Sequence, residues 1–291
     1  MRSIPPRSPP WILETGGSLS ASTGSSPHIT VESLALRTGA GIGIATAVDN
    51  LASNTGGTFV VLNNQGDLTI TAVDGLTAST NGSSLGSGIS ALGVLTFAAD
   101  TSSTASGSYL ATTSIDVANG VTVSSGILLA FEAPTVNLDG DLIGTNGISG
   151  SATTVNVLSD TGGAEVQDAI YVARAGALAG DNVTIDIAAG TYASFVVPFS
   201  HPNPTIIGAG NDAGSITTIE TGSPAITIAA NGTTIQDMLL TSGAGIDIGI
   251  LLDGATTPFL TGINIVNVDF TASASGSSAR AISATAAAAS T

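Results

Sequence analysis

Asn182-Val183-Thr184-Ile185-Asp186-Ile187 opens the series of short β-branched runs that decides the fold. The later runs are Thr205-Ile206-Ile207-Gly208, Thr217-Thr218-Ile219, Ala225-Ile226-Thr227-Ile228, Thr233-Thr234-Ile235, Gly249-Ile250-Leu251-Leu252 and Ile263-Asn264-Ile265-Val266-Asn267-Val268. Gly, Asn, Asp and Ser separate these runs where a doubly wound sheet would need helices. Each run suits one rung of a solenoid, which turns Ile and Val inward and bonds its backbone to neighbouring coils about 4.8 Å away.

The composition agrees with a narrow, aliphatic core. Of the 291 residues, 43% are apolar but only 4% are aromatic, so the interior must be built from Val, Ile, Leu and Ala. The 37 glycines, with many Ser and Thr, raise the alternative of disorder. Disordered chains are poor in β-branched residues and rich in charge, and this chain has the opposite composition. We therefore expect a folded chain.

The charge balance restricts the partners. The chain has 21 acidic residues against five arginines, Arg2, Arg7, Arg37, Arg174 and Arg280, and no lysine. Nucleic-acid binding depends on Lys and Arg that neutralise phosphates, so this class of partner is excluded. Neutral glycans, surface proteins and divalent cations such as Ca²⁺ remain open.

Targeting signals are weak. The chain has no cysteine, which excludes disulfides and thiolate metal sites. No apolar run of about 18 residues could span a membrane, and Met1–Pro10 lacks the apolar region of a signal peptide. The acidic, lysine-free composition nevertheless favours an extracellular or cell-surface bacterial protein. We expect the chain to be a fragment of a larger exoprotein.

The pattern divides the chain into five parts. They are a disordered Pro-rich leader (1–15), a degenerate β-repeat region (16–150), a linker (151–164), a parallel β-helix (165–275) and a low-complexity tail (276–291). Runs such as Asp67-Leu68-Thr69-Ile70-Thr71 in the second part alternate between an inward apolar and an outward polar face. Their irregular spacing indicates degenerate repeats of about 20 residues.

A short helix is expected at about 164–177, before the second set of strands. Asp160 or Thr161 is its candidate N-cap, and Val166, Ile170 and Ala173 fall on one helical face. This face would cover the open end of the solenoid that follows, because a bare final coil exposes strand edges that promote aggregation.

Several of these motifs carry a family resemblance. The order Val166-Gln167-Asp168-Ala169-Ile170, Val183 to Tyr192, Ile206-Ile207-Gly208-Ala209-Gly210 and Thr233 to Met238 resembles the opening of pectate-lyase-like right-handed parallel β-helix proteins. The resemblance covers about 165–271. Residues 16–150 resemble the degenerate repeats of filamentous-haemagglutinin-type exoproteins. This implies an all-β, right-handed parallel β-helix with a short N-terminal capping helix, preceded by a further β-solenoid-like region, but no particular activity.

Catalytic residues are hard to find in the sequence. An inverting hydrolase needs carboxylates that converge on one face. Asp237, Asp247 and Asp269 are the candidates for a glycoside hydrolase or lyase-like enzyme, but they form no adjacent pair. We therefore expect no catalytic site and interpret the chain as a non-enzymatic, adhesin-like solenoid that presents a glycan- or protein-binding surface.

The sequence offers one candidate metal site and few other groups. Asn137, Asp139 and Asp141 place three oxygen ligands at a spacing that suits surface Ca²⁺, without the downstream Glu of an EF-hand. No other cofactor and no oligomeric state is indicated. His201, in a Pro-rich loop, is expected to be exposed and without a partner. Thr-rich solenoid faces can also bind ice, but the Thr positions here do not repeat at a fixed spacing.

Overall fold

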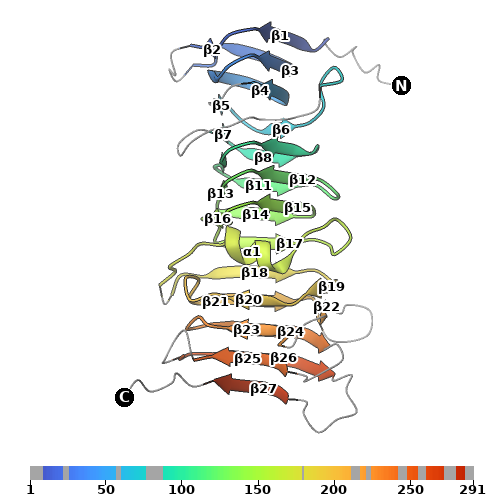
Figure 1. The fold of residues 1–291 in the computed structure, drawn as a ribbon, viewed down its shortest axis with the longest axis vertical. Helices are drawn as coiled ribbons and strands as arrows, with labels where there is room; N and C mark the ends of the chain where they lie inside the picture. The colour runs from blue at the N-terminus through green and yellow to red at the C-terminus, as the bar shows by residue number, and fades with distance from the viewer. Residues whose placement is uncertain are drawn as a thin grey trace, which may run out of the picture. The chain divides into compact units, whose positions relative to one another are not determined.

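The computed structural model describes residues 9–21, 26–56, 60–76, 88–178, 180–210, 217–220, 224–241, 248–254, 260–271 and 280–285. Its elements in chain order (Figure 1) are β1 (Trp11–Thr15), β2 (Leu19–Ser20), β3 (Ile29–Thr38), β4 (Ile42–Thr55), β5 (Val60–Asn64), β6 (Leu68–Ile70), β7 (Gly88–Ala91), β8 (Val94–Phe97), β9 (Thr101–Ser103), β10 (Gly107–Ala111), β11 (Ser114–Val117), β12 (Thr122–Ser125), β13 (Leu129–Glu132), β14 (Thr135–Leu138), β15 (Asp141–Gly144), β16 (Ile148–Gly150), β17 (Thr154–Val157), α1 (Val166–Val172), β18 (Val183–Ile187), β19 (Gly190–Ala193), β20 (Phe195–Val197), β21 (Pro204–Gly208), β22 (Thr217–Glu220), β23 (Ile226–Ile228), β24 (Thr234–Thr241), β25 (Ile248–Asp253), β26 (Asn264–Thr271) and β27 (Arg280–Thr285).

The chain is an all-β parallel solenoid with one short helix, and it divides into two compact units. The N-terminal unit comprises Met1–Ala133 with Leu142–Ile148, and the C-terminal unit comprises Pro134–Asp141 with Ser149–Thr291. Strands pair in parallel in both, as β3 does with β4 and β18 with β21. No helix in the described parts of the chain is long and apolar enough to cross a membrane.

The N-terminal unit is built from stacked strands whose apolar side chains align in columns. One inward column runs through Leu34, Leu51, Ile70, Phe97 and Val117. A second, from another face, runs through Ile44, Leu62, Ile89, Tyr109 and Phe131. The two columns meet where Phe97 packs edge-to-face on Tyr109, with ring centroids 4.9 Å apart. This contact fixes the core of the unit, because buried rings in such T-shaped pairs favour one arrangement.

In the C-terminal unit the first two coils after α1 have three strands each, whereas β24 and β26 of the next coils each run through the first two faces. The first coil of strands after α1 contains β18, β19 and β20, which pair with β21, β22 and β23 of the next coil. The first face carries a buried column of Val136, Val155, Ile185, Ile206 and Ile235. Alternation along each strand turns the remaining positions outward. The predicted parallel β-helix is therefore confirmed.

Helix α1 closes one face of the C-terminal unit. Its Val166, Ile170 and Ala173 are buried, as the helical spacing predicts. The Gln167 carboxamide accepts the Val196 N–H (2.8 Å) and donates to the Val196 carbonyl (3.1 Å), so it pairs with edge strand β20 as a further strand would. The helix does not cap the first face, because β17 before the helix pairs in register with β18 after it, and the sheet continues past the helix. The predicted N-cap was wrong: Glu165 occupies that position, without a side-chain cap bond.

Three segment assignments from the sequence need correction. Residues Trp11–Thr15, which we had assigned to a disordered leader, form β1 and pair with β3. Within the expected linker, residues 154–157 form β17. Within the expected tail, Arg280–Thr285 form β27, which pairs with β25. In each case stacking on a neighbouring coil supplies the backbone partners that a local reading of the sequence cannot see.

Candidate functional site

The first face of the C-terminal unit carries an outward row of hydroxyl side chains, which we call the threonine column. Its members, in register from strand to strand, are Thr135, Thr154, Thr184, Thr205, Thr234 and finally Asn264. The five threonines are half-buried and Asn264 is exposed. The sequence spacing of these residues is irregular because the loops between rungs differ in length. Stacking restores a register that the spacing alone conceals.

A second outward row lies two residues further along the same strands. It contains Asn137, Asn156, Asp186, Ile207, Gln236 and Val266. The Asn156 carboxamide donates to Asn137 Oδ1 at 2.6 Å, so amide side chains bridge successive rungs. The face is therefore polar toward β14 and more apolar toward β26.

The calcium candidates lie at the start of this face. Asn137 Oδ1 is engaged by Asn156, and Asp139 accepts a hydrogen bond from the Ser159 hydroxyl. Burial, followed by the field of Asp141, raises the pKa of Glu165. Within the described residues, no group of three or more His, Cys, Asp or Glu side chains could hold a metal ion. That search covers no asparagine, so calcium binding through Asn137, Asp139 and Asp141 stays a prediction.

The corner that follows this face is electrostatically negative. Burial, then the fields of Asp160 and Asp139, raise the pKa of Tyr192 to about 12. The Asp160 carboxylate also accepts the Thr191 N–H at 2.7 Å. Gly190 allows this close approach, since a Cβ there would lie 2.8 Å from the Asp160 carboxyl carbon. The corner therefore holds carboxylates against backbone with little room between them.

Two carboxylates of the enzymatic alternative, Asp237 and Asp269, lie on the paired strands β24 and β26, and Asp269 is two residues beyond Asn267, which stacks on Asp237. Asp237 sits at a bend in β24 with a φ of 56°, and its carboxylate accepts the Asn267 amide at 2.7 Å. Asn267 has a φ of 50°, so the two left-handed residues stack at one corner of successive coils. Asp269 is exposed and in register with Leu239. Asp247 lies outside the described residues.

His201 is not the exposed side chain that we expected from its loop. It is 9% exposed, its Nδ1 lies 3.0 Å from Ser200 Oγ, and its ring meets the Tyr171 ring edge-on. Burial lowers its pKa, and a hydrogen bond to the Ala173 backbone partly offsets this effect. The imidazole therefore serves to pack the loop before β21 against the end of α1.

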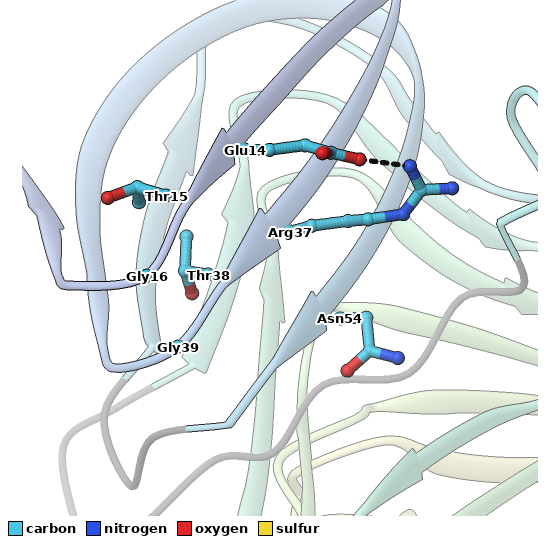
Figure 2. Close-up of a pocket in the computed structure, with 7 residues that line it drawn as sticks. All are labelled: Glu14, Thr15, Gly16, Arg37, Thr38, Gly39 and Asn54. Carbon is cyan, nitrogen blue, oxygen red and sulfur yellow. Dashed lines mark hydrogen bonds and ion pairs between the residues drawn. The ribbon is translucent and has the colours of Figure 1, made fainter.

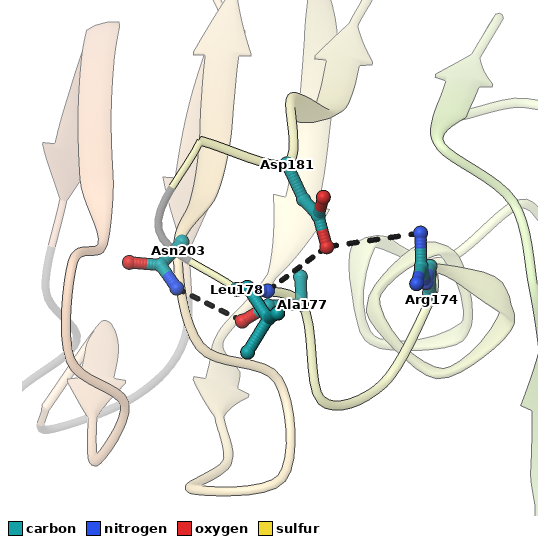
Figure 3. A network of polar contacts seen from close by, with 5 residues as sticks. All are labelled: Arg174, Ala177, Leu178, Asp181 and Asn203. Atoms are coloured by element: carbon teal, nitrogen blue, oxygen red, sulfur yellow. Dashed lines mark hydrogen bonds and ion pairs between the residues drawn. The ribbon is translucent and has the colours of Figure 1, made fainter.

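A polar network fastens the loop that leaves α1 (Figure 3). Asp181 Oδ2 lies 3.7 Å from Arg174 Nη1 and accepts the Leu178 N–H at 2.9 Å. Asn203 donates to the Ala177 carbonyl at 2.9 Å. One of the few basic residues of the chain is thus used to hold a loop.

The N-terminal unit has a polar surface pocket of about 440 Å³ that sequence reasoning missed (Figure 2). Glu14, Arg37 and Asn54 line it in register on β1, β3 and β4, and Arg37 donates to Glu14. The signal in the sequence is a Thr-Gly pair after each of these residues, at 15–16, 38–39 and 55–56. The ion pair is exposed, with Arg37 and Glu14 side chains 40% and 57% accessible, so it contributes little to stability.

No protein-family model matches this chain, and no curated protein or solved structure is significantly similar to it. The architecture is therefore established by the strand pairing of the chain itself. The resemblances to pectate-lyase-like and filamentous-haemagglutinin-type proteins carry no support from these comparisons.

Proposed function

We propose that the chain is a non-enzymatic, extracellular or cell-surface β-solenoid that presents a binding surface to glycans or proteins. The observation that carries this proposal is the threonine column, whose members stay in register over six strands. Each inner rung is bonded to rungs on both sides, so its side chains repeat at about 4.8 Å on a stiff support. Such a surface suits a repetitive ligand that makes many weak contacts.

The charge and composition support the same proposal. With 21 acidic and five basic residues, the surface repels nucleic acid and other polyanions. An acidic, cysteine-free solenoid is compatible with an adhesin-like bacterial exoprotein. In this proposal residues 16–150 correspond to haemagglutinin-like repeats and residues 165–275 to a right-handed, pectate-lyase-like β-helix.

A polysaccharide panel tests the proposal. The purified chain is incubated with neutral and acidic polysaccharides and with cell-surface protein extracts, and retention and new chain ends are scored in the same tubes. The test variant combines Thr184→Val and Thr205→Val, which removes two neighbouring hydroxyls of the column but keeps the β-branched shape. The matched control combines Thr69→Val and Thr96→Val, an equivalent stacked pair in the N-terminal unit.

The outcomes distinguish a binding surface from an enzyme and from a chain that binds none of these ligands. Retention that falls in the test variant but not in the control supports a binding column on the first face. New chain ends that disappear with Asp237→Ala or Asp269→Ala would show an enzyme and overturn the proposal. The absence of retention on every glycan and protein offered would contradict a binding function.

A further inference from the structure

An apolar hollow of about 330 Å³ lies at one corner of the C-terminal unit, where β17, β18 and β21 end. We call it the corner hollow. Leu158, Ala188, Ile207 and Ala209 supply most of its exposed aliphatic lining. Leu158 is 49% exposed and contributes a large aliphatic side chain at the rim of the hollow. The hollow therefore offers apolar surface to a side chain that comes from outside.

The hollow exists because small residues replace large ones over two rungs. Leu158, Ala188 and Ala209 each follow the last inward residue of their strand, which is Val157, Ile187 or Gly208. The two alanines leave space beside the leucine. Gly208 is needed on the third strand, because a Cβ there would lie 2.2 Å from the Asp237 carbonyl. The three strand ends therefore set the shape of the hollow, and Leu158, Ala188 and Ala209 are the first residues beyond them.

One aspartate lines the corner hollow, and two more lie on the neighbouring rungs. Asp186 lines it and is exposed. Asp139 occupies the rung before Leu158, since Leu138 is in register with Val157. Asp237 follows on the other side, where its carbonyl accepts the Gly210 N–H at 3.1 Å.

The basic residues of the C-terminal unit lie elsewhere. Among its described residues, Arg174 pairs with Asp181 near the end of α1. Arg280 lies on β27, which pairs with β25 and not with the strands that form the hollow. Neither of these arginines lines the hollow. An apolar hollow lined by Asp186, with Asp139 and Asp237 on the neighbouring rungs, is complementary to a ligand that combines an aliphatic group with positive charge.

We propose that the corner hollow binds basic peptide segments of a partner protein, with an aliphatic side chain in the hollow and flanking Lys or Arg side chains beside Asp186 and its neighbours. This rests on the proposed function and narrows its ligand from glycans or proteins to a basic peptide. A glycan would gain less here, because the lining is largely aliphatic and contains no aromatic ring on which a sugar could stack.

Fluorescence anisotropy of labelled peptides tests the proposal on the full chain. The probe is an acetylated, amidated pentapeptide that alternates Lys and Leu, compared with peptides in which Glu or Gln replaces every Lys. Asp186→Asn should weaken binding about two- to fivefold, as expected for one exposed ion pair. Ala209→Trp, which fills the hollow from an exposed position, should abolish it. The matched controls are Glu132→Gln, an exposed carboxylate, and Leu178→Ser, an exposed leucine outside the hollow.

The proposal is supported if the Lys peptide alone binds, if added salt weakens it, and if only the hollow variants reduce it. Equal binding to Ala209→Trp and to the unsubstituted chain would overturn it, because the attraction would then come from the net charge of −16 alone. Binding of the Glu peptide, or of no peptide, would also overturn it. Retention on a polysaccharide in the absence of peptide binding would refute this inference while leaving the proposed function intact.

Discussion

Replacing Asn64 by leucine should destabilise the N-terminal unit far more than its position at a strand end would suggest. Asn64 is 1% exposed and its carboxamide makes five hydrogen bonds, of which the one to the Gly66 carbonyl is long at 3.5 Å and the other four are short. It accepts from the Thr46 hydroxyl (2.9 Å) and the Val48 N–H (2.9 Å), and it donates to the carbonyls of Val48 (3.0 Å) and Asp67 (2.8 Å). At about 1 kcal/mol of net stability for each short bond, the loss is about 4 kcal/mol. Most domains have only about 5–15 kcal/mol in total.

Urea denaturation followed by far-UV circular dichroism measures this loss, and hydrogen exchange at the Val48 amide localises it. The matched control is Asn63→Leu one residue earlier, where the side chain is half-buried and its Oδ1 accepts the Ser90 hydroxyl at 2.7 Å. That change should cost about 1 kcal/mol. Equal costs for the two substitutions, or unchanged exchange at Val48 in Asn64→Leu, would refute the assigned role of the buried carboxamide.

Three further predictions concern single contacts. Gln167→Ala should raise hydrogen exchange at the Val196 amide and cost about 1–2 kcal/mol, because two bonds to the β20 edge are lost; unchanged exchange would contradict the edge pairing. Gly39→Ala should lower the urea midpoint, since its Cβ would lie 2.3 Å from the Gly16 carbonyl oxygen, whereas Gly16→Ala meets nothing within 4 Å and should be mild. Burial lowers the His201 pKa, so the unfolded chain binds the proton first and stability should fall below about pH 6.5; His201→Phe should flatten that pH profile.

The fold could be predicted from the sequence because its signal is local. Each strand needs only three to five residues that alternate between Ile or Val and a polar side chain, and Val183–Ile187 shows this directly. The register could not be predicted, since it depends on the length of the loops between rungs. Thr184 and Thr205 are closer in sequence than Thr205 and Thr234, yet both pairs are adjacent rungs.

The polar side chains of the interior were missed for a different reason. Asn64 lies beside a turn in which Gly66 adopts a φ of 120°. Nothing in the residue type shows that the carboxamide is buried, because asparagine at a turn is usually exposed. His201 was missed in the same way. In both cases the neighbouring coil buries the group, and that contact has no local sequence signature.

The same stacking decides what kind of binding surface the chain can offer. A side chain on an inner rung has a backbone bonded on both sides, so it keeps its position without help from loops. One exposed contact on such a face is worth little, because solvent and salt screen it. Affinity must then come from a ligand that spans several rungs of the threonine column or fills the corner hollow. Loss of one hydroxyl should therefore be almost silent, whereas a bulky side chain at Ala209, which occupies space shared by three rungs, should not.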